Sequence, residues 1–281
     1  MQLSKHHGLA NDFLVILDEV NGRALSVDGE LAKRVCDRRT GIGADGLIHG
    51  AAPPPGADVD VVMHLYNADG GRAETSGNGI RCLAHAVARA REAAELHLSV
   101  ETDAGTRAVV VRAAEASDQT AFVEARMGAV GPGPELPTDV IDRLGHAAAS
   151  GVRRYATADI GNPHLVVEVD DPSQVDLALG AWIDQHVSGG INVEFAAADP
   201  DPARDEIVMR VWERGAGATE ACGTGACATA TVFRGWGWHP GAEQIVVRMP
   251  GGQAEIRFER DGEAILAGLV HHVATIELPD A

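Results

Sequence analysis

At 281 residues the chain is long enough to form two domains, or one domain built from two halves. Hydrophobic residues make up 45% of it and charged residues 23%, which is typical of a folded globular protein and not of a disordered one. The formal net charge of −18 argues against nucleic acid as a partner, because binding a phosphate backbone needs clustered Lys and Arg.

The first half of the chain predicts strands, then a helix, then more strands. A helix is expected over residues 31–38, and residues 61–66 form a β-rich run. An Ala-rich segment without Pro over residues 80–91 predicts a helix that begins just after Ser76-Gly77-Asn78-Gly79. Residues 98–111 predict a hairpin around Gly105.

The second half repeats this order. After weaker helical patterns over residues 140–149 and 177–185 comes a β-rich run over residues 207–212. A helix is expected over residues 226–233, just after Cys222-Gly223-Thr224-Gly225, and residues 245–258 predict a second hairpin.

The two halves are related by an internal duplication. Residues 63–67 align with residues 209–213 at an offset of 146, and residues 76–79 align with residues 222–225 at the same offset. Residues 11–15 resemble residues 162–166, where the offset has drifted to 151. We therefore expect an N-terminal half at residues 1–118, completed by residues 269–281, and a C-terminal half at residues 119–268.

Several absences narrow the class of protein. Residues 1–7 lack the features of a secretory signal, and no apolar stretch approaches the roughly 20 residues that cross a bilayer, so we expect a cytoplasmic protein without membrane contact. Lys5 and Lys33 are the only lysines, and neither lies in a setting typical of a Schiff base, so a pyridoxal-phosphate mechanism lacks its attachment point. The four cysteines form no C-x-x-C pair and are expected to be free thiols.

The paired helix starts predict acid–base chemistry at one carbon. A helix N-terminus presents unpaired N–H groups and a positive dipole end, which favour anions. Cys222 in that position is expected to be a partly exposed thiol of lowered pKa, with Cys36, Cys82 and Cys227 inert. Two such helix starts could grip one carboxylate and place two side chains on opposite faces of its α-carbon, as inversion requires.

Each feature also has a structural interpretation. A single Gly-x-Gly before a helix is usually a tight turn, and a lone cysteine is usually a buried packing residue. Asn67 and Asn192 could cap turns, His164 could be a structural histidine, and the pair Glu213-Arg214 could be an exposed ion pair of little energetic value. The duplication at one offset favours the functional interpretation.

The chain resembles the diaminopimelate epimerase family over essentially its whole length. The segments that carry the resemblance, in order and spacing, are residues 11–13, 37–46, 67–70, 76–82, 161–164, 190–193, 213–217 and 221–225. The resemblance implies an α/β (α+β) fold of two pseudo-twofold-related halves, each a strongly curved mixed sheet around a central helix, with the active site between them. It further implies a homodimer without metal or cofactor that converts L,L-diaminopimelate to the meso form, a step towards lysine and peptidoglycan precursors.

The same resemblance assigns roles to residues. Cys222 would be one base and Ser76 would occupy the place of the other, with His164 and Glu213 ionising or orienting the bases. Arg214 would clamp the far carboxylate and Glu213 would pair with the far ammonium. The full set implied to bind substrate is Asn11, Asn67, Gly77, Asn78, Asn162, Asn192, Glu213, Arg214, Gly223 and Thr224.

Two residues depart from the family pattern. Ser76 stands where the family has cysteine, and an alcohol is a far weaker acid than a thiol. It is consistent with an engineered or catalytically impaired Cys-to-Ser form, with a naturally activated serine, or with a relative that uses a single base. Ala218 stands where the family usually has glutamate. The alternatives to an epimerase are a related amino-acid racemase, isomerase or dehydratase, and a binding protein that has lost catalysis.

Overall fold

The computed structural model of the chain describes residues 1–73, 75–114, 117–147, 151–201, 204–238 and 241–279. The chain forms two compact units, one of Met1–Arg126 with Ala267–Ala281 and the other of Met127–Leu266. Strands β8 (Ser117–Ala129) and β17 (Glu263–Glu277) run from one unit into the other. Both strands cross the expected boundaries at residues 118 and 268, and the division into residues 1–118 with 269–281 and residues 119–268 stays a prediction.

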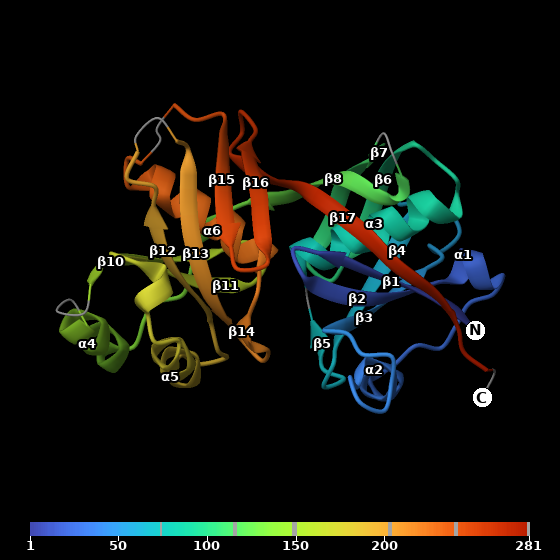
Figure 1. The fold of residues 1–281 in the computed structure, drawn as a ribbon, viewed down its shortest axis with the longest axis horizontal. Helices are drawn as coiled ribbons and strands as arrows, with labels where there is room; N and C mark the ends of the chain where they lie inside the picture. Colours follow the sequence, from blue (N-terminus) through green and yellow to red (C-terminus); the bar gives the residue numbers. More distant parts are fainter. Residues whose placement is uncertain (74, 115–116, 148–150, 202–203, 239–240, 280–281) are drawn as a thin grey trace. The chain divides into compact units, whose positions relative to one another are not determined.

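Unit 1 is a mixed sheet around one helix, as expected (Figure 1). Its elements are β1 (Gln2–Gly8), β2 (Asn11–Leu17), α1 (Asp18–Asn21), α2 (Gly29–Cys36), β3 (Gly46–Ala51), β4 (Val61–Asn67), β5 (Arg72–Ala73), α3 (Gly77–Ala90), β6 (Glu95–Thr102) and β7 (Gly105–Ala114). The β2–β3 and β4–β6 pairs are parallel, whereas β1–β2, β3–β4 and β6–β7 are antiparallel. Helix α3 contacts β1, β2, β3, β4, β6 and β7, so the sheet curves around it.

Unit 2 repeats this plan. Its elements are β9 (Gly131–Pro132), α4 (Thr138–His146), β10 (Val152–Asp159), β11 (Pro163–Val169), η2 (Pro172–Gln174), α5 (Ala178–His186), β12 (Asn192–Ala198), β13 (Glu206–Glu213), β14 (Gly217–Thr219), α6 (Gly223–Gly235), β15 (Gln244–Met249) and β16 (Gly252–Phe258). The β11–β12 and β13–β15 pairs are parallel, matching β2–β3 and β4–β6. Helix α6 is contacted by β10, β11, β12, β13, β15 and β16 (Figure 1).

The expected elements are present with small differences at their ends. Helix α2 stops at Cys36, two residues before the expected end at residue 38, because Asp37 turns out of helical geometry to receive the N–H groups of Arg39 and Thr40. Helix α4 begins two residues earlier than expected. The last two residues of the expected helix 140–149 lie outside the described residues.

Each unit buries its own apolar core. In unit 1 the side chains of Leu14, Ile16 and Leu47 pack against Leu31 and Val35 of α2. In unit 2 a second core includes Leu165, Val167, Ile183, Val193 and Phe195. These cores pack helices α2 and α5 against the parallel pairs β2–β3 and β11–β12, and packed strands of this kind can place a site precisely. Among the described residues, no helix has the length and apolar character needed to cross a bilayer.

Candidate functional site

The two central helices begin with the same cap. Ser76 is the N-cap of α3, and its Oγ accepts the N–H of Gly79 at 3.0 Å. Cys222 is the N-cap of α6, and its Sγ accepts the N–H of Gly225 at 3.3 Å. Both residues have extended backbone, with φ of −148° and −122°. The duplication therefore extends to the hydrogen bonds at positions 76 and 222.

The helices begin three residues earlier than the sequence predicts. Helix α3 starts at Gly77 and α6 starts at Gly223, whereas helices were expected over residues 80–91 and 226–233. The expectation that each helix begins just after its Gly-x-Gly segment is wrong, because both glycines of each segment lie in the first helical turn. The side chains of Ser76 and Cys222 cap that turn, because each accepts a backbone N–H that has no acceptor within the helix.

The expectation of a partly exposed Cys222 thiol with a lowered pKa is also wrong. Its relative exposure is 4%, and burial is the main reason that the pKa of Cys222 lies well above the ordinary value of 9.0. The charges of Glu213 and Glu194 raise this pKa further. The hydrogen bonds from Thr224 and Gly225 act in the opposite direction, but they and the helix dipole do not outweigh burial and two carboxylates.

Glu213 is the acidic neighbour of the thiol. It ends β13, and its carboxylate accepts a short hydrogen bond from Thr219 Oγ1 on the following strand β14. Burial raises the pKa of Glu213, and hydrogen bonds with Thr219 and Cys222 oppose this rise. Because the buried thiol and the half-buried carboxylate each make ionisation of the other harder, the pair favours one shared proton.

His164 is brought to the site indirectly. It lies on β11, fully buried, with Nδ1 2.7 Å from Glu194 Oε1 and Nε2 3.0 Å from Asn162 Oδ1. Asn162 Nδ2 in turn donates to Thr224 Oγ1 at 3.4 Å, and Thr224 Oγ1 lies 3.4 Å from Cys222 Sγ. The predicted residues Asn162, His164, Thr224 and Cys222 are thus joined by one chain of hydrogen bonds.

Glu194 is the site residue that the sequence interpretation missed. It lies on β12 with a relative exposure of 0%, and its Oε1 is so close to α6 that a Cβ built on Gly225 would lie 2.6 Å from it. The signal that could have revealed it is a carboxylate in the otherwise apolar, buried run of residues 193–196. Such a residue is rarely fully buried unless it is paired.

Unit 1 has apolar residues at the positions that match His164 and Glu194 of unit 2. In the parallel pair β11–β12, His164 faces Asn192 and Val166 faces Glu194. In the corresponding pair β2–β3, Phe13 faces Gly46 and Val15 faces Ile48. Phe13 and Ile48 therefore stand where unit 2 has a histidine and a glutamate, so the two halves share a fold but not the acid–base groups around the helix start.

Around Ser76 the polar contacts are made by predicted substrate-binding residues. Asn78 Nδ2 donates to Asn11 Oδ1 at 3.3 Å, and Asn78 Oδ1 accepts from the fully buried Arg81 at 2.6 Å. Asn11 Nδ2 also donates to Asp45 Oδ2 at 2.7 Å. Gly77 and Asn78 form the buried first turn of α3, as Gly223 and Thr224 do in α6.

Asn192 and Arg214 are brought together in unit 2. Asn192 Nδ2 donates to the carbonyl of Pro163 at 2.9 Å, and its Oδ1 accepts the backbone N–H of Arg214 at 3.0 Å. Asn192 thereby ties the start of β11 to the end of β13. The guanidinium of Arg214 donates to the Gly189 carbonyl at 3.3 Å, which orients the fork beside the loop before β12.

The remaining predicted positions lie at strand ends. Asn67 ends β4, and its backbone closes a turn through hydrogen bonds with Gly70 and Gly71. Ala218 is exposed on β14, opposite Trp212 of β13. The described residues hold no group of three His, Cys, Asp or Glu side chains arranged to bind a metal ion.

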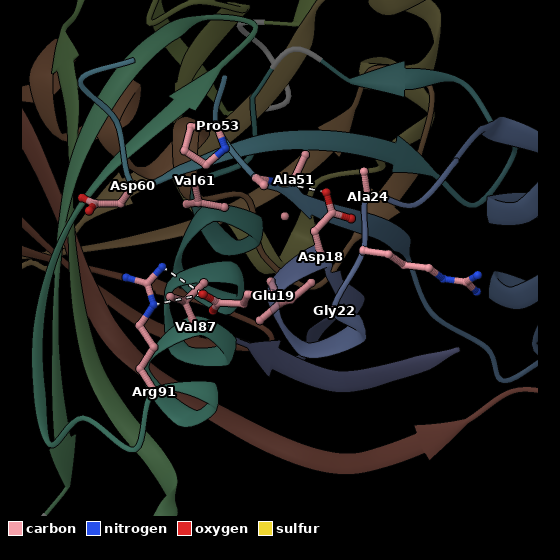
Figure 2. Close-up of a pocket in the computed structure, with 14 residues that line it drawn as sticks. Asp18, Glu19, Gly22, Ala24, Ala51, Pro53, Asp60, Val61, Val87 and Arg91 are labelled. Carbon is pink, nitrogen blue, oxygen red and sulfur yellow. Dashed lines mark hydrogen bonds and ion pairs between the residues drawn. The ribbon is translucent and has the colours of Figure 1, made fainter. Parts of the chain in front are cut away.

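A separate pocket of about 370 Å³ lies in unit 1, beside α1 and the end of α3 (Figure 2). Its buried carboxylate, Asp18, is already engaged by His49 Nε2 at 2.9 Å and by the backbone N–H groups of Leu25 and Ala52. Glu19 pairs with Arg91 at 3.0 Å across the same pocket (Figure 2). These groups stabilise the α1 region and offer no uncommitted catalytic side chain.

Comparison with known families gives one clear match. A sequence model of the family described as diaminopimelate epimerase matches residues 3–131 and 156–273. The diaminopimelate epimerase of Synechococcus elongatus is 38% identical over 280 residues, which cover 95% of this chain and 94% of the relative. The diaminopimelate epimerase of Methanothermobacter thermautotrophicus is 37% identical over 270 residues, which cover 92% of this chain and 91% of the relative.

Solved structures share the fold at low sequence identity. A predicted epimerase from Pseudomonas aeruginosa has a TM-score of 0.76 at 16% identity, covering 100% of this chain and 99% of that chain. A hydroxyproline epimerase from Agrobacterium vitis, with bound trans-4-hydroxy-L-proline, has a TM-score of 0.66 at 15% identity. The match covers 98% of this chain and 91% of that chain. These likenesses extend the fold assignment to both units.

Proposed function

The chain belongs to the diaminopimelate epimerase family, and we propose that it epimerises L,L-diaminopimelate to meso-diaminopimelate without a cofactor. The observation that carries the proposal is the Cys222 thiol at the N-terminus of α6, hydrogen-bonded by Thr224 and Gly225 and next to Glu213. A buried thiol with an adjacent carboxylate is a group that can give and take one proton.

In the proposed reaction Cys222 exchanges the proton on one face of the α-carbon. The thiol proton passes to Glu213, and the resulting thiolate removes the α-proton. The N–H groups in the first turn of α6, at Gly223 and Thr224, would hold the substrate carboxylate and disperse the charge that develops on it. Because the pKa of Cys222 is raised in the free protein, a substrate ammonium and the neighbouring N–H groups are needed to offset the two carboxylates.

Ser76 is proposed to serve the opposite face. Two-base inversion requires that the residues at positions 76 and 222 act on one α-carbon, which is the role that the shared cap geometry supports. The Ser76 hydroxyl is a weak acid, so we propose that this chain epimerises its substrate more slowly than it would with cysteine at position 76. Ser76→Cys should then raise the epimerisation rate by a factor of about 10²–10⁴, the usual value of a positioned acid–base group. A naturally activated serine predicts little gain or a loss.

The substrate's far end is proposed to bind Arg214, which would clamp the second carboxylate, and Glu213, which would attract the second ammonium. Asn11, Asn67, Asn78, Asn162, Asn192 and Gly77 complete the proposed binding set. Arg214→Lys keeps the charge but loses the planar fork, so substrate binding should weaken markedly. Unchanged binding by that variant would place the far-carboxylate clamp elsewhere.

Four further proposals accompany the epimerase assignment: a homodimer, a cytoplasmic location, independence from pyridoxal phosphate, and a place in lysine and peptidoglycan precursor synthesis. The dimer is supported by two large apolar side chains exposed on β17, Leu269 at 48% and Val273 at 54%. Sedimentation of the parent and of Leu269→Lys checks it. A monomeric parent would contradict the dimer.

The reaction class is tested with a panel of substrates. The protein is incubated in deuterated water with L,L-diaminopimelate, proline and hydroxyproline, and loss of each α-proton is followed by NMR. Exchange and inversion of diaminopimelate alone are expected. Exchange of proline or hydroxyproline instead would favour a related racemase or isomerase, loss of water would favour a dehydratase, and no exchange on any of them would favour a binding protein.

A further inference from the structure

A continuous chain of hydrogen bonds links Glu194 to the Cys222 thiol through three side chains. Its distances are 2.7 Å from Glu194 to His164, 3.0 Å from His164 to Asn162, 3.4 Å from Asn162 to Thr224 and 3.4 Å from Thr224 to the sulfur. Glu194, His164, Thr224 and Cys222 are all buried. Water therefore competes little with the inner links of the chain.

The donor roles in this chain follow from its carboxylate and its amide. A carboxylate can only accept, so His164 Nδ1 donates to Glu194. Asn162 turns its amide nitrogen to Thr224 and its oxygen to His164 Nε2. Because Thr224 Oγ1 accepts from Asn162, its own hydrogen is left to donate to the Cys222 sulfur.

Glu194 is the carboxylate at the end of this chain. Its second oxygen, Oε2, is buried without a hydrogen-bond partner among the described residues, and its first oxygen, Oε1, contacts His164 Nδ1 at 2.7 Å. The corresponding residue of unit 1 is Ile48, beside the Ser76 helix start. A buried carboxylate with one partner is costly, and a merely structural position could hold an apolar side chain, as unit 1 does.

We propose that Glu194 is a positioning residue for the Cys222 thiolate. By holding His164 Nδ1, it fixes the imidazole ring against Asn162, and Asn162 in turn directs the Thr224 hydroxyl onto the sulfur. This inference rests on the proposed function for its value in catalysis. The negative charge of Glu194 directly opposes ionisation of the Cys222 thiol, whereas its action through the hydrogen-bond chain favours ionisation.

The two effects predict opposite results for Glu194→Gln. Loss of a nearby negative charge alone would make the thiol more acidic. Loss of the directed Thr224 hydroxyl, whose hydrogen bond lowers the pKa of Cys222, makes the thiol less acidic. Among the described residues, two carboxylates act on the thiol from the strands around α6, namely Glu213 on β13 and Glu194 on β12. His164 on β11 contacts Glu194, and the substitution leaves Glu213 unchanged.

The test is the rate at which iodoacetamide alkylates Cys222, followed by peptide mapping from roughly pH 7 to pH 9, where the rate tracks the thiolate fraction. Glu194→Gln should react about tenfold more slowly than the parent across this range, which corresponds to a shift of about one pH unit. Faster or equal alkylation would overturn the proposal. Loosened packing would also accelerate the reaction, so a structural role cannot produce the expected result.

Two further variants complete the experiment. Thr224→Val removes the last link, so adding Glu194→Gln in that background should no longer slow alkylation; an undiminished slowing would overturn the proposal. Glu168→Gln is the matched control, because Glu168 is a buried carboxylate on the neighbouring strand β11 that pairs with Arg154, and its alkylation rate should equal that of the parent. No substrate is needed, so these outcomes are independent of the epimerase assignment.

Discussion

Gly225 provides a quantitative test of how tightly Glu194 is packed against α6. In Gly225→Ala the new Cβ would lie 2.6 Å from Glu194 Oε1, 3.1 Å from its Cγ and 3.2 Å from its Cδ. That carboxylate cannot move aside freely, because it is fully buried and held by His164. Overpacking of this kind typically costs about 1–3 kcal/mol, whereas alanine gains at most about 1 kcal/mol over glycine within a helix.

The matched variant is Gly79→Ala, at the same place in α3. Its Cβ would lie 3.0 Å from Ser76 Cβ, 3.1 Å from Ser76 Oγ and 3.3 Å from Ile48 Cδ1. All three distances are longer than the 2.6 Å to Glu194 Oε1, so smaller shifts relieve these contacts. Gly225→Ala should therefore be less stable than Gly79→Ala by about 1–2 kcal/mol.

Urea unfolding measures this difference. All four tryptophans, Trp182, Trp212, Trp236 and Trp238, belong to unit 2, so their fluorescence reports the unit that contains Gly225. The Gly225→Ala transition should move to lower urea, while Gly79→Ala should leave the fluorescence transition within about 1 kcal/mol of the parent. A Gly225→Ala protein as stable as the parent would refute the close packing of Glu194 on the helix start.

Three further changes have definite expected outcomes. Asp28→Ala removes the N-cap of α2, whose carboxylate accepts a backbone N–H at 2.9 Å, and should cost about 1 kcal/mol in urea unfolding; no change would contradict the cap. Burial lowers the pKa of His6 well below 6.5, so below pH 6.5 the unfolded chain binds more protons than the folded chain. The free energy of unfolding should therefore fall as the pH falls, and it should fall less steeply in His6→Gln. Equal slopes in the two proteins would contradict this. Thr219→Val removes a hydrogen bond that lowers the pKa of Glu213, so the acid limb of the activity profile should move to higher pH, and an unmoved limb would exclude Glu213 as the titrating group.

The sequence predicts the architecture well because the duplication is a strong constraint. A constant offset of 146 between residues 76–79 and 222–225 predicts two equivalent helix starts, and the structure gives them the same side-chain cap. The mixed sheet around a central helix is confirmed in each unit. Helix ends were less accurate, because a cap depends on side-chain hydrogen bonds that periodicity does not report.

The electrostatics of the site could not be predicted in the same way. The position of Cys222 at a helix start correctly indicates favourable N–H groups, but its burial and the approach of Glu194 from β12 depend on strand register. Glu194 lies 28 residues before Cys222 in sequence, with no local motif that connects them. The proximity of Glu194 to the Cys222 helix start can be recognised only once the positions of β12 and α6 in the structure are known.

The central claim is that the Cys222 thiol exchanges the substrate α-proton, and its most direct test is deuterium incorporation into diaminopimelate in deuterated water. Because exchange on one face needs only the base on that face, the parent should incorporate deuterium faster than it epimerises, despite Ser76. Cys222→Ala should lose that exchange by a factor of about 10²–10⁴. Equal exchange rates in the parent and Cys222→Ala would contradict the account.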